Sequence, residues 1–323
     1  MISINSSISI SPPSIIQIIW YPFRVVSGFI FRVLLRWKPE KSAVEDVHTS
    51  TSKSNTATPV TPAHIEVIEV RPYHPPGVTK IIDRGGGSFI GLVDETTVLK
   101  YPCPPGDRKG IEIEAELLEI LKKHPRIIAS KGLNKYGLAL QYAKNGSLYK
   151  YITSGHHEIA VEQRLRWCKQ AAEAVKYIHE KNIIHCDINL RNFLLDDNFD
   201  IVLADFQGML KSPRGETLMD GLSRECSKSF MPRSHGDYAD VKTDIFALGS
   251  AIYFIMLGHE LFPELDSLEH DEEIASRFRD GRFPTEEHAC SQITDKCWRQ
   301  MFNSAADVID DISQIQGRFG NHR

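Results

Sequence analysis

The segment from Ile183 to Gly208, IIHCDINLRNFLLDDNFDIVLADFQG, constrains the fold more than any other part of this 323-residue chain. Its second half, FLLDDNFDIVLADF, has two apolar runs around an Asp-Asn pair, which predicts a strand, a tight turn and a second strand. Such a hairpin would carry Asp205 back toward Asn192. A carboxylate and an amide brought together in this way can share a metal ion.

The same segment carries the groups that phosphoryl transfer requires. This chemistry needs one carboxylate beside the accepting hydroxyl, and other oxygen ligands that hold Mg²⁺ against the phosphates of ATP. Asp187 suits the first role, and Asn192 and Asp205 suit the second. The segment resembles that of the eukaryotic protein kinases, whose catalytic loop reads H-R-D-L-x-x-x-N and whose metal-binding motif reads D-F-G. Here the two motifs read HCDINLRN and DFQ.

Upstream, IIDRGGGSFIGLVDETTVLKYP resembles the kinase glycine-rich hairpin and the strand that carries the ATP lysine. Glycines at a strand-to-strand turn let backbone amides approach phosphate oxygens, and a lysine held by a strand can reach the phosphates. Gly85 and Gly87 match the first two glycines, and Lys100 matches the lysine. The third glycine position falls on Ile90, one residue before Gly91, so this loop departs from the family's pattern.

Next, GIEIEAELLEILKKHPRII has apolar residues at helical spacing and predicts a helix that stops at His124, before a proline. It resembles the kinase αC helix. Glu114 shares a face with the apolar residues, so we expect it to pair with Lys100. Glu112 and Glu116 are close alternatives, because a solvated charged face explains most of these glutamates.

The segment YGLALQYAKNGSLYKYI resembles the last strand of the small lobe, the hinge and the first helix of the large lobe. The resemblance implies that Leu140 is the gatekeeper and that Gln141, Tyr142 and Ala143 form the hinge, which binds adenine through backbone groups. The following segment, RLRWCKQAAEAVKYIHEKN, predicts a long helix whose end delivers His185.

Several positions depart from the family's motifs. Cys186 replaces the arginine that pairs with an activation-loop phosphate, which indicates a non-RD kinase whose regulation does not depend on such a phosphorylation. Gln207 replaces the glycine of D-F-G and is expected to restrict the movement of that motif. Asn189 stands where serine/threonine kinases have lysine. Arg191 stands where many tyrosine kinases have arginine and could supply the missing catalytic-loop charge, so hydroxyl specificity stays open.

The sequence FMPR stands where the family has A-P-E. Arg233 thus replaces a glutamate whose arginine partner, near the end of the domain, aligns with Phe302. Because both partners are replaced, we expect no unpaired buried charge. The stretch between Asp205 and Arg233 is long enough for an activation segment. Beyond it, DVKTDIFALGSAIYFIMLG resembles the buried αF helix, and Asp244 matches the aspartate that braces the catalytic loop.

Residues 14–38 differ in kind from the rest. They are strongly apolar, yet arginines recur on one helical face, which predicts an amphipathic basic helix. Lying in a membrane surface is favoured over spanning, because an arginine near the bilayer centre costs about 2.5–3.5 kcal/mol. A mitochondrial presequence and a helix docked on the globular body are the alternatives. Residues 1–13 are predicted to be disordered, and 39–64 to be a flexible linker.

Composition narrows the functional class. The formal charge of −4 gives no reason to expect nucleic acid as a partner. Six cysteines without a C-x-x-C pair argue against a zinc site and a disulfide framework. A reducing, cytoplasmic compartment is the simplest interpretation, with membrane association or mitochondrial targeting through the N-terminal segment.

Together these features predict an α+β, two-lobed kinase-like fold, with the N-lobe and hinge at 65–143 and the C-lobe at 144–323. The resemblance implies a kinase that uses ATP and Mg²⁺ to phosphorylate a serine, threonine or tyrosine hydroxyl of a protein substrate. One alternative is a pseudokinase that serves as a nucleotide-binding or scaffold module. Another is a small-molecule phosphotransferase of the aminoglycoside or choline kinase type, against which the MPR, TDIFALG and DKCW segments stand. The oligomeric state stays open.

Overall fold

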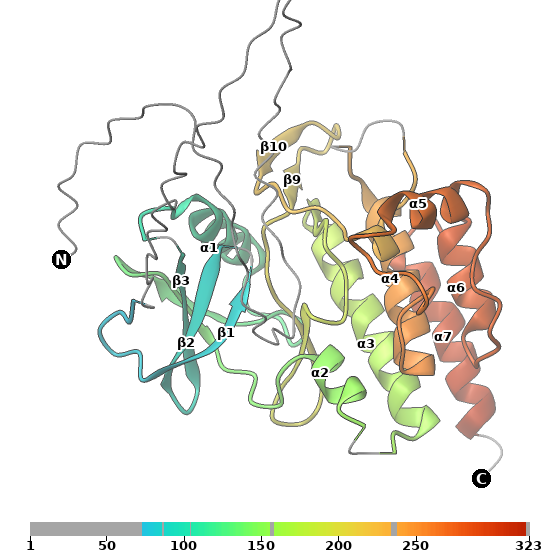
Figure 1. Cartoon of the computed structure of the whole chain (residues 1–323), viewed down its shortest axis with the longest axis horizontal. Helices are drawn as coiled ribbons and strands as arrows, with labels where there is room; N and C mark the ends of the chain where they lie inside the picture. The colour runs from blue at the N-terminus through green and yellow to red at the C-terminus, as the bar shows by residue number, and fades with distance from the viewer. Residues whose placement is uncertain (1–72, 86, 104, 156–157, 234–237, 321–323) are drawn as a thin grey trace, which may run out of the picture. The chain divides into compact units, whose positions relative to one another are not determined.

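The computed structural model describes residues 73–85, 87–103, 105–155, 158–233 and 238–320. These residues form a small lobe rich in strands, followed by a larger lobe that is mainly helical (Figure 1). The predicted α+β, two-lobed architecture is confirmed. The predictions for residues 1–64 lie outside the described residues. Among those that are described, no helix is both long and apolar enough to cross a lipid bilayer.

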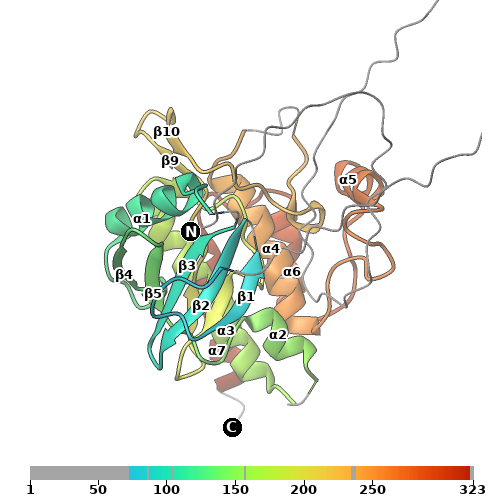
Figure 2. The same ribbon diagram turned by 60° about the vertical axis from the view of Figure 1, so that its left-hand side comes forward.

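The small lobe is a five-stranded antiparallel sheet with one helix. The strands pair in the order β1-β2-β3-β5-β4, and Figure 2 shows the sheet with α1 beside it. The elements are β1 (Lys80–Gly85), β2 (Ser88–Asp94), β3 (Thr97–Pro102), α1 (Lys109–Leu121), β4 (Ser130–Leu133) and β5 (Leu138–Gln141).

Helix α1 buries one face and leaves its glutamates mostly outside. Of its acidic residues, Glu114 alone is buried, on the same face as Leu117 and Leu121. The helix ends at Leu121, so the prediction that it continues to His124 was wrong. Lys122 has φ of 56° and ψ of −171°, which do not continue the helix, and its N–H donates to Leu118 O at 3.0 Å. The helix therefore ends before the chain reaches the proline.

The large lobe is built around two helices, α3 and α4. Its helices are α2 (Leu148–Thr153), α3 (Val161–Glu180), α4 (Val241–Leu257), α5 (Asp271–Arg279), α6 (Ser291–Trp298) and α7 (Ala305–Gly320), with a 3₁₀ turn η1 (Ser227–Ser229). Helix α4 is buried along nearly its whole length, as expected from its apolar sequence. Asp240 caps its N-terminus in a capping box with Thr243, and Gly258 ends it with φ of 90°.

Two small sheets position the loops of the large lobe. The strands are β6 (Ile183–Ile184), β7 (Phe193–Leu195), β8 (Ile201–Leu203), β9 (Met209–Lys211) and β10 (Thr217–Asp220). The predicted hairpin between Asn192 and Asp205 is confirmed, because β7 and β8 pair antiparallel with Phe193 opposite Leu203. The second sheet has the order β10-β9-β6, which ties the chain after Asp205 to the strand that leads into His185.

Candidate active site

A lysine and two carboxylates from three separate elements meet between the lobes. Lys100 lies on β3, Glu114 on α1, and Asp205 just after β8. Lys100 Nζ donates to Glu114 Oε2 and to Asp205 Oδ1, each at 2.5 Å. Glu114 is fully buried, whereas the Asp205 side chain is 44% exposed. The structure therefore brings Glu114, and not Glu112 or Glu116, against Lys100.

The electrostatics of this cluster favour its charged forms. Burial alone would lower the pKa of Lys100, but the carboxylates of Asp205 and Glu114 outweigh it and raise the pKa. For Asp205, partial burial acts upward and the neighbouring ammonium acts downward, with the result that the pKa lies below its usual value. Burial raises the pKa of Glu114 although Lys100 opposes it. The cluster thus presents an ionised carboxylate beside a protonated lysine.

The catalytic loop holds a second carboxylate between two amides. Asn192 Nδ2 donates to Asp187 Oδ2 at 2.9 Å, and Asn189 Nδ2 donates to Asp187 Oδ1 at 2.8 Å. Asn192 Nδ2 also donates to Asp187 O at 2.8 Å, which closes the loop on itself. Both oxygens of the carboxylate are therefore oriented before any ligand arrives. Asn189, which replaces the lysine of serine/threonine kinases, takes part in this orientation.

The Asp187 carboxylate is placed to accept a proton near neutral pH. Burial, assisted by the negative charge of Asp205, raises the pKa of Asp187 to about 7, against the two amide donors that lower it. A general base works best when its pKa lies near the working pH.

The base of the catalytic loop rests on Asp244 of α4. This fully buried carboxylate accepts from the backbone N–H of His185 at 2.8 Å and of Cys186 at 3.0 Å. His179, at the end of α3, lies 3.0 Å from it through Nε2. These bonds fix Cys186 in a left-handed conformation with φ of 62°, which orients the following residue, Asp187.

The DFQ motif is packed against the catalytic loop. Phe206 is fully buried, and its ring packs edge-on against the ring of His185, with the ring centroids 5.2 Å apart. Its N–H donates to Glu114 Oε1 at 3.3 Å. Gln207 lies against the first turn of α1, since a Cβ on Gly110 would come within 3.5 Å of its side chain. Gly208 cannot be exchanged for a larger residue, because a Cβ there would collide with the Ile184 carbonyl.

The glycines of the glycine-rich hairpin differ in what requires them. Gly87 has φ of 82°, a conformation that other residues rarely adopt. A Cβ placed on Gly85 would meet no atom within 4 Å in the part of the chain that the structure describes. Gly91 is needed for packing, because a Cβ at this position would lie 2.5 Å from the Val78 side chain. Ile90, at the third glycine position, pairs with Lys100 across the β2–β3 ladder.

The residues predicted to form the gatekeeper and the hinge lie at the end of β5 and directly after it. Leu140 and Ala143 are buried. The N–H groups of Gln141 and Tyr142 donate to the carbonyls of Ala129 and Thr96, at 2.8 and 2.9 Å. These two N–H groups are therefore already engaged within the protein.

Arg191 is the predicted catalytic residue that the structure does not bring into the cluster. Its guanidinium lies 3.8 Å above the Tyr149 ring and 3.9 Å from Glu260. The groups that orient Asp187 are Asn189 and Asn192 instead.

Two ion pairs near the site were missed by sequence reasoning. Arg233 pairs with Glu225 at 2.8 Å, with both side chains nearly inaccessible. Arg233, which stands at the position of the A-P-E glutamate, is therefore buried but paired. Its partner is the nearby Glu225, which the sequence did not indicate. Lys150 of α2 pairs with Asp83 of β1 at 2.7 Å, across the two lobes. Neither pair has a fixed spacing in the sequence that could have revealed it.

The oxygen atoms near the cluster suit Mg²⁺. Asn192 uses its amide nitrogen for Asp187, which leaves its Oδ1 as a ligand, and Asp205 uses only Oδ1 for Lys100. Among the described residues, no three His, Cys, Asp or Glu side chains are grouped to hold a metal by themselves. One carboxylate and one amide, completed by phosphate oxygens and water, are the ligands that Mg²⁺ commonly takes.

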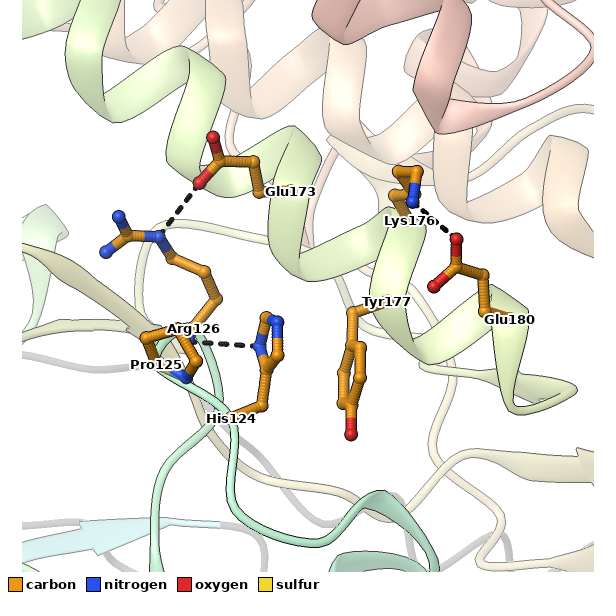
Figure 3. Close-up of a pocket in the computed structure, with 7 residues that line it drawn as sticks. All are labelled: His124, Pro125, Arg126, Glu173, Lys176, Tyr177 and Glu180. Carbon is orange, nitrogen blue, oxygen red and sulfur yellow. Dashed lines mark hydrogen bonds and ion pairs between the residues drawn. The ribbon is translucent and has the colours of Figure 1, made fainter.

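A separate groove lies outside this site. Its volume is about 220 Å³, and it runs between the turn after α1 and helix α3. Figure 3 shows His124 beside Tyr177, with the Arg126–Glu173 and Lys176–Glu180 pairs around them. The two rings are stacked, and their centroids lie 3.8 Å apart. Tyr177 Oη also donates to the carbonyl of Leu121. The groove therefore marks where the end of α1 is fastened to the large lobe.

Comparison with known proteins agrees with this geometry. Residues 98–308 match the family described as protein tyrosine and serine/threonine kinase. The chain therefore belongs to the protein kinase family, as the motifs predicted. It is 28% identical over 193 residues to the Aurora kinase of Eremothecium gossypii, covering 57% of this chain and 49% of that protein.

Two further relatives are similar over comparable lengths. Serine/threonine-protein kinase SIK1 of Rattus norvegicus is 32% identical to this chain over 201 residues, which cover 60% of this chain and 24% of the length of SIK1. The dual serine/threonine and tyrosine protein kinase of Gallus gallus is 25% identical to this chain over 239 residues, which cover 69% of this chain and 24% of the length of that kinase. The chain thus spans half or less of the length of these relatives.

Proposed function

We propose that this chain is an active protein kinase of the non-RD type, which transfers the γ-phosphoryl group of ATP to a hydroxyl of a protein substrate. The observation that supports activity is the joint presence of the Lys100–Glu114–Asp205 cluster and the Asp187 carboxylate held by two amides. A module that only binds nucleotide has no need for an oriented base whose pKa is raised to about 7.

Each residue has a definite part in this proposal. Lys100, kept in place by Glu114, holds the phosphates of ATP. Asp187 orients the accepting hydroxyl and takes its proton as the new P–O bond forms. Asn192 and Asp205 hold Mg²⁺, which when bound neutralises the negative charge of the phosphates. The hinge, from Gln141 to Ala143, receives adenine, with Leu140 as the gatekeeper.

The experiment is transfer of labelled γ-phosphate from ATP by the purified full chain, to itself and to myelin basic protein. The control is Asp187→Asn, and nucleotide binding is measured on both proteins. Transfer by the wild type that the substitution reduces about a thousandfold supports a kinase. A folded wild type that binds ATP and transfers no phosphate would instead be a pseudokinase. Transfer to an amino sugar or choline but to no protein would make it a small-molecule phosphotransferase.

We also infer, from the sequence alone, that residues 14–38 attach this kinase to an anionic membrane surface on the cytoplasmic side. The pattern of apolar residues and arginines supports this location. Flotation of the full chain with vesicles containing phosphatidylserine tests it, with phosphatidylcholine vesicles as the control. Import into isolated mitochondria followed by cleavage of the segment would contradict it.

A further inference from the structure

Cys186 stands at the place where the family's arginine would reach toward an activation-loop phosphate. It is fully buried and carries no positive charge. Burial raises the pKa of its thiol, and the charges that act on it belong to Asp244, Glu225, Arg224 and Asp220. Three of these four residues come from the activation segment, which we define as residues 205–233. Charges of both signs from the segment therefore act electrostatically on the buried position where the family has its arginine.

Asp220 and Arg224 form a two-point ion pair within this segment. Arg224 Nη1 lies 3.2 Å from Asp220 Oδ1, and Arg224 Nη2 lies 3.0 Å from Asp220 Oδ2. The two side chains are only about a quarter exposed. Asp220 Oδ1 also accepts from the N–H of Leu222 at 2.8 Å. The pair is a bidentate, charge-assisted contact that closes the turn after β10.

This turn rests directly on the DFQ motif. The N–H of Gly221 donates to Gly208 O at 2.9 Å, and the N–H of Ser223 donates to Gln207 O at 3.1 Å. A Cβ on Gly221 would collide with the Gln207 carbonyl, so the two backbones approach as closely as they can. The order of the turn is thereby coupled to the order of the residues that follow Asp205.

A second pair anchors the end of the segment. Arg233 and Glu225 meet at 2.8 Å with side chains 5% and 0% exposed. The Arg233 guanidinium also lies 4.1 Å above the Phe230 ring. Buried charges of this kind must be paired, so the contact specifies the path of residues 225–233. The far end of the segment is thus fastened independently of the catalytic loop.

We propose that Asp220 and Arg224 take the place of an activation-loop phosphate and its arginine, so that the unphosphorylated segment already has its substrate-binding arrangement. Asp220 supplies the negative charge and Arg224 supplies the guanidinium that Cys186 lacks. They are positioning residues, because they act on the DFQ motif and the substrate surface without touching ATP. The inference rests on the proposed kinase activity for its consequence, but the order of the segment can be measured without that activity.

The experiment uses the full chain freed of phosphate by a broad-specificity phosphatase, with the intact mass as proof. We expect kcat/KM for myelin basic protein to stay within twofold of that of the untreated protein. Asp220→Asn lowers this kcat/KM about tenfold and leaves the KM for ATP within twofold. The same substitution speeds amide exchange of residues 209–224 about tenfold. A general loss of folding would move both KM values and the exchange of α4 as well.

Arg224→Gln and the double variant separate a pair from two unrelated residues. We expect the double variant to lose less than the sum of the two single variants, because the contact that they share can be removed only once. Glu272→Gln is the matched control, since Glu272 pairs with Arg279 on an exposed face of α5 at 2.6 Å. It should change none of the readouts.

Two results would overturn the inference. One is a tenfold or larger loss of kcat/KM when phosphate is removed from the wild type. The other is unchanged exchange of residues 209–224 in Asp220→Asn. If the wild type transfers no phosphate at all, the proposed function fails, and the exchange measurement alone then decides whether the pair orders the segment.

Discussion

The catalytic loop and the glycine-rich hairpin face the same site but are built in opposite ways. Asp187 and Asn192 are 6% and 9% exposed and are held by bonds that lead down to the buried Asp244. A Cβ added to Gly85 would meet no atom within 4 Å, and the hairpin strand around this glycine is exposed. Under the proposed function, the half of the site that accepts the proton is therefore organised in advance, whereas the half that covers the phosphates is left to be completed by its ligand.

The contrast follows from what each half must do. A general base has to lie within hydrogen-bonding distance of the proton that it accepts. Movement of its side chain away from this position therefore lowers the reaction rate. A loop that covers phosphates has to admit and release a nucleotide, so it needs backbone N–H groups that are free until the ligand arrives. The Lys150–Asp83 pair is half-exposed at both ends, which makes it a weak tie between the hairpin strand and α2.

The largest effect is expected at Asp187. Asp187→Asn should lower kcat about a thousandfold, because the amide cannot accept the proton. Its stability relative to the wild type should be higher at pH 8 than at pH 4 by roughly 1–3 kcal/mol, since the ionised carboxylate of the wild type is buried and its pKa is raised to about 7. The gain should shrink as the pH falls from 8 toward 4, because the folded wild type then binds the proton. Denaturant melts at both pH values check this, and a difference in stability that does not change with pH would contradict it.

The next effect concerns the support beneath the loop. Asp244→Asn leaves a neutral group facing the backbone N–H groups of His185 and Cys186, and should destabilise the chain by about 2–3 kcal/mol. Asp240→Asn, which alters the N-cap of the same helix, should cost well under 1 kcal/mol, because asparagine caps as well as aspartate. Urea unfolding of the two variants measures the difference. Equal losses would mean that Asp244 serves α4 and not the loop.

A smaller effect is expected at the lysine partner. Glu114→Gln keeps the shape but removes the charge opposite Lys100, and should lower kcat/KM for ATP about tenfold to a hundredfold. Glu112→Gln, on the same helix and paired at 3.1 Å with the partly exposed Arg108, is the control and should change it less than twofold. Steady-state kinetics with varied ATP separates them. Full activity in Glu114→Gln would show that Asp205 alone holds the lysine.

The pH profile tests the state of the base itself. With the pKa of Asp187 raised to about 7, its ionised form is lost as the pH falls, and kcat/KM for the protein substrate should drop about tenfold between pH 8 and pH 6. Glu114→Gln should keep the same midpoint, because the pKa of Asp187 is set by burial and by Asp205. A midpoint near 4 would show that the free enzyme holds Asp187 in a more solvated state.

Sequence reasoning succeeded where the physics is local. The β7–β8 hairpin and the helices follow from apolar periodicity and turn residues, and the choice of Glu114 followed from its position on the apolar face of α1. It failed where the outcome depends on the path of a loop. The Arg233–Glu225 pair joins residues whose approach is set by packing beneath the segment, and the end of α1 depends on the backbone of Lys122. No periodicity encodes such contacts.

The smallest effect is expected in the glycine-rich hairpin, and it bears most directly on the contrast between the two halves of the site. Gly87→Ala should raise the KM for ATP roughly threefold to tenfold, because its φ of 82° strains any other residue by about 1 kcal/mol. The methyl group added in Gly85→Ala meets no atom of the described residues within 4 Å, so we expect any loss that it causes to come from contact with the bound phosphates. Amide exchange without nucleotide should be unchanged in Gly85→Ala. If Gly85→Ala alters the free protein as strongly as Gly87→Ala does, the hairpin is organised before the nucleotide binds, and the contrast between the two halves disappears.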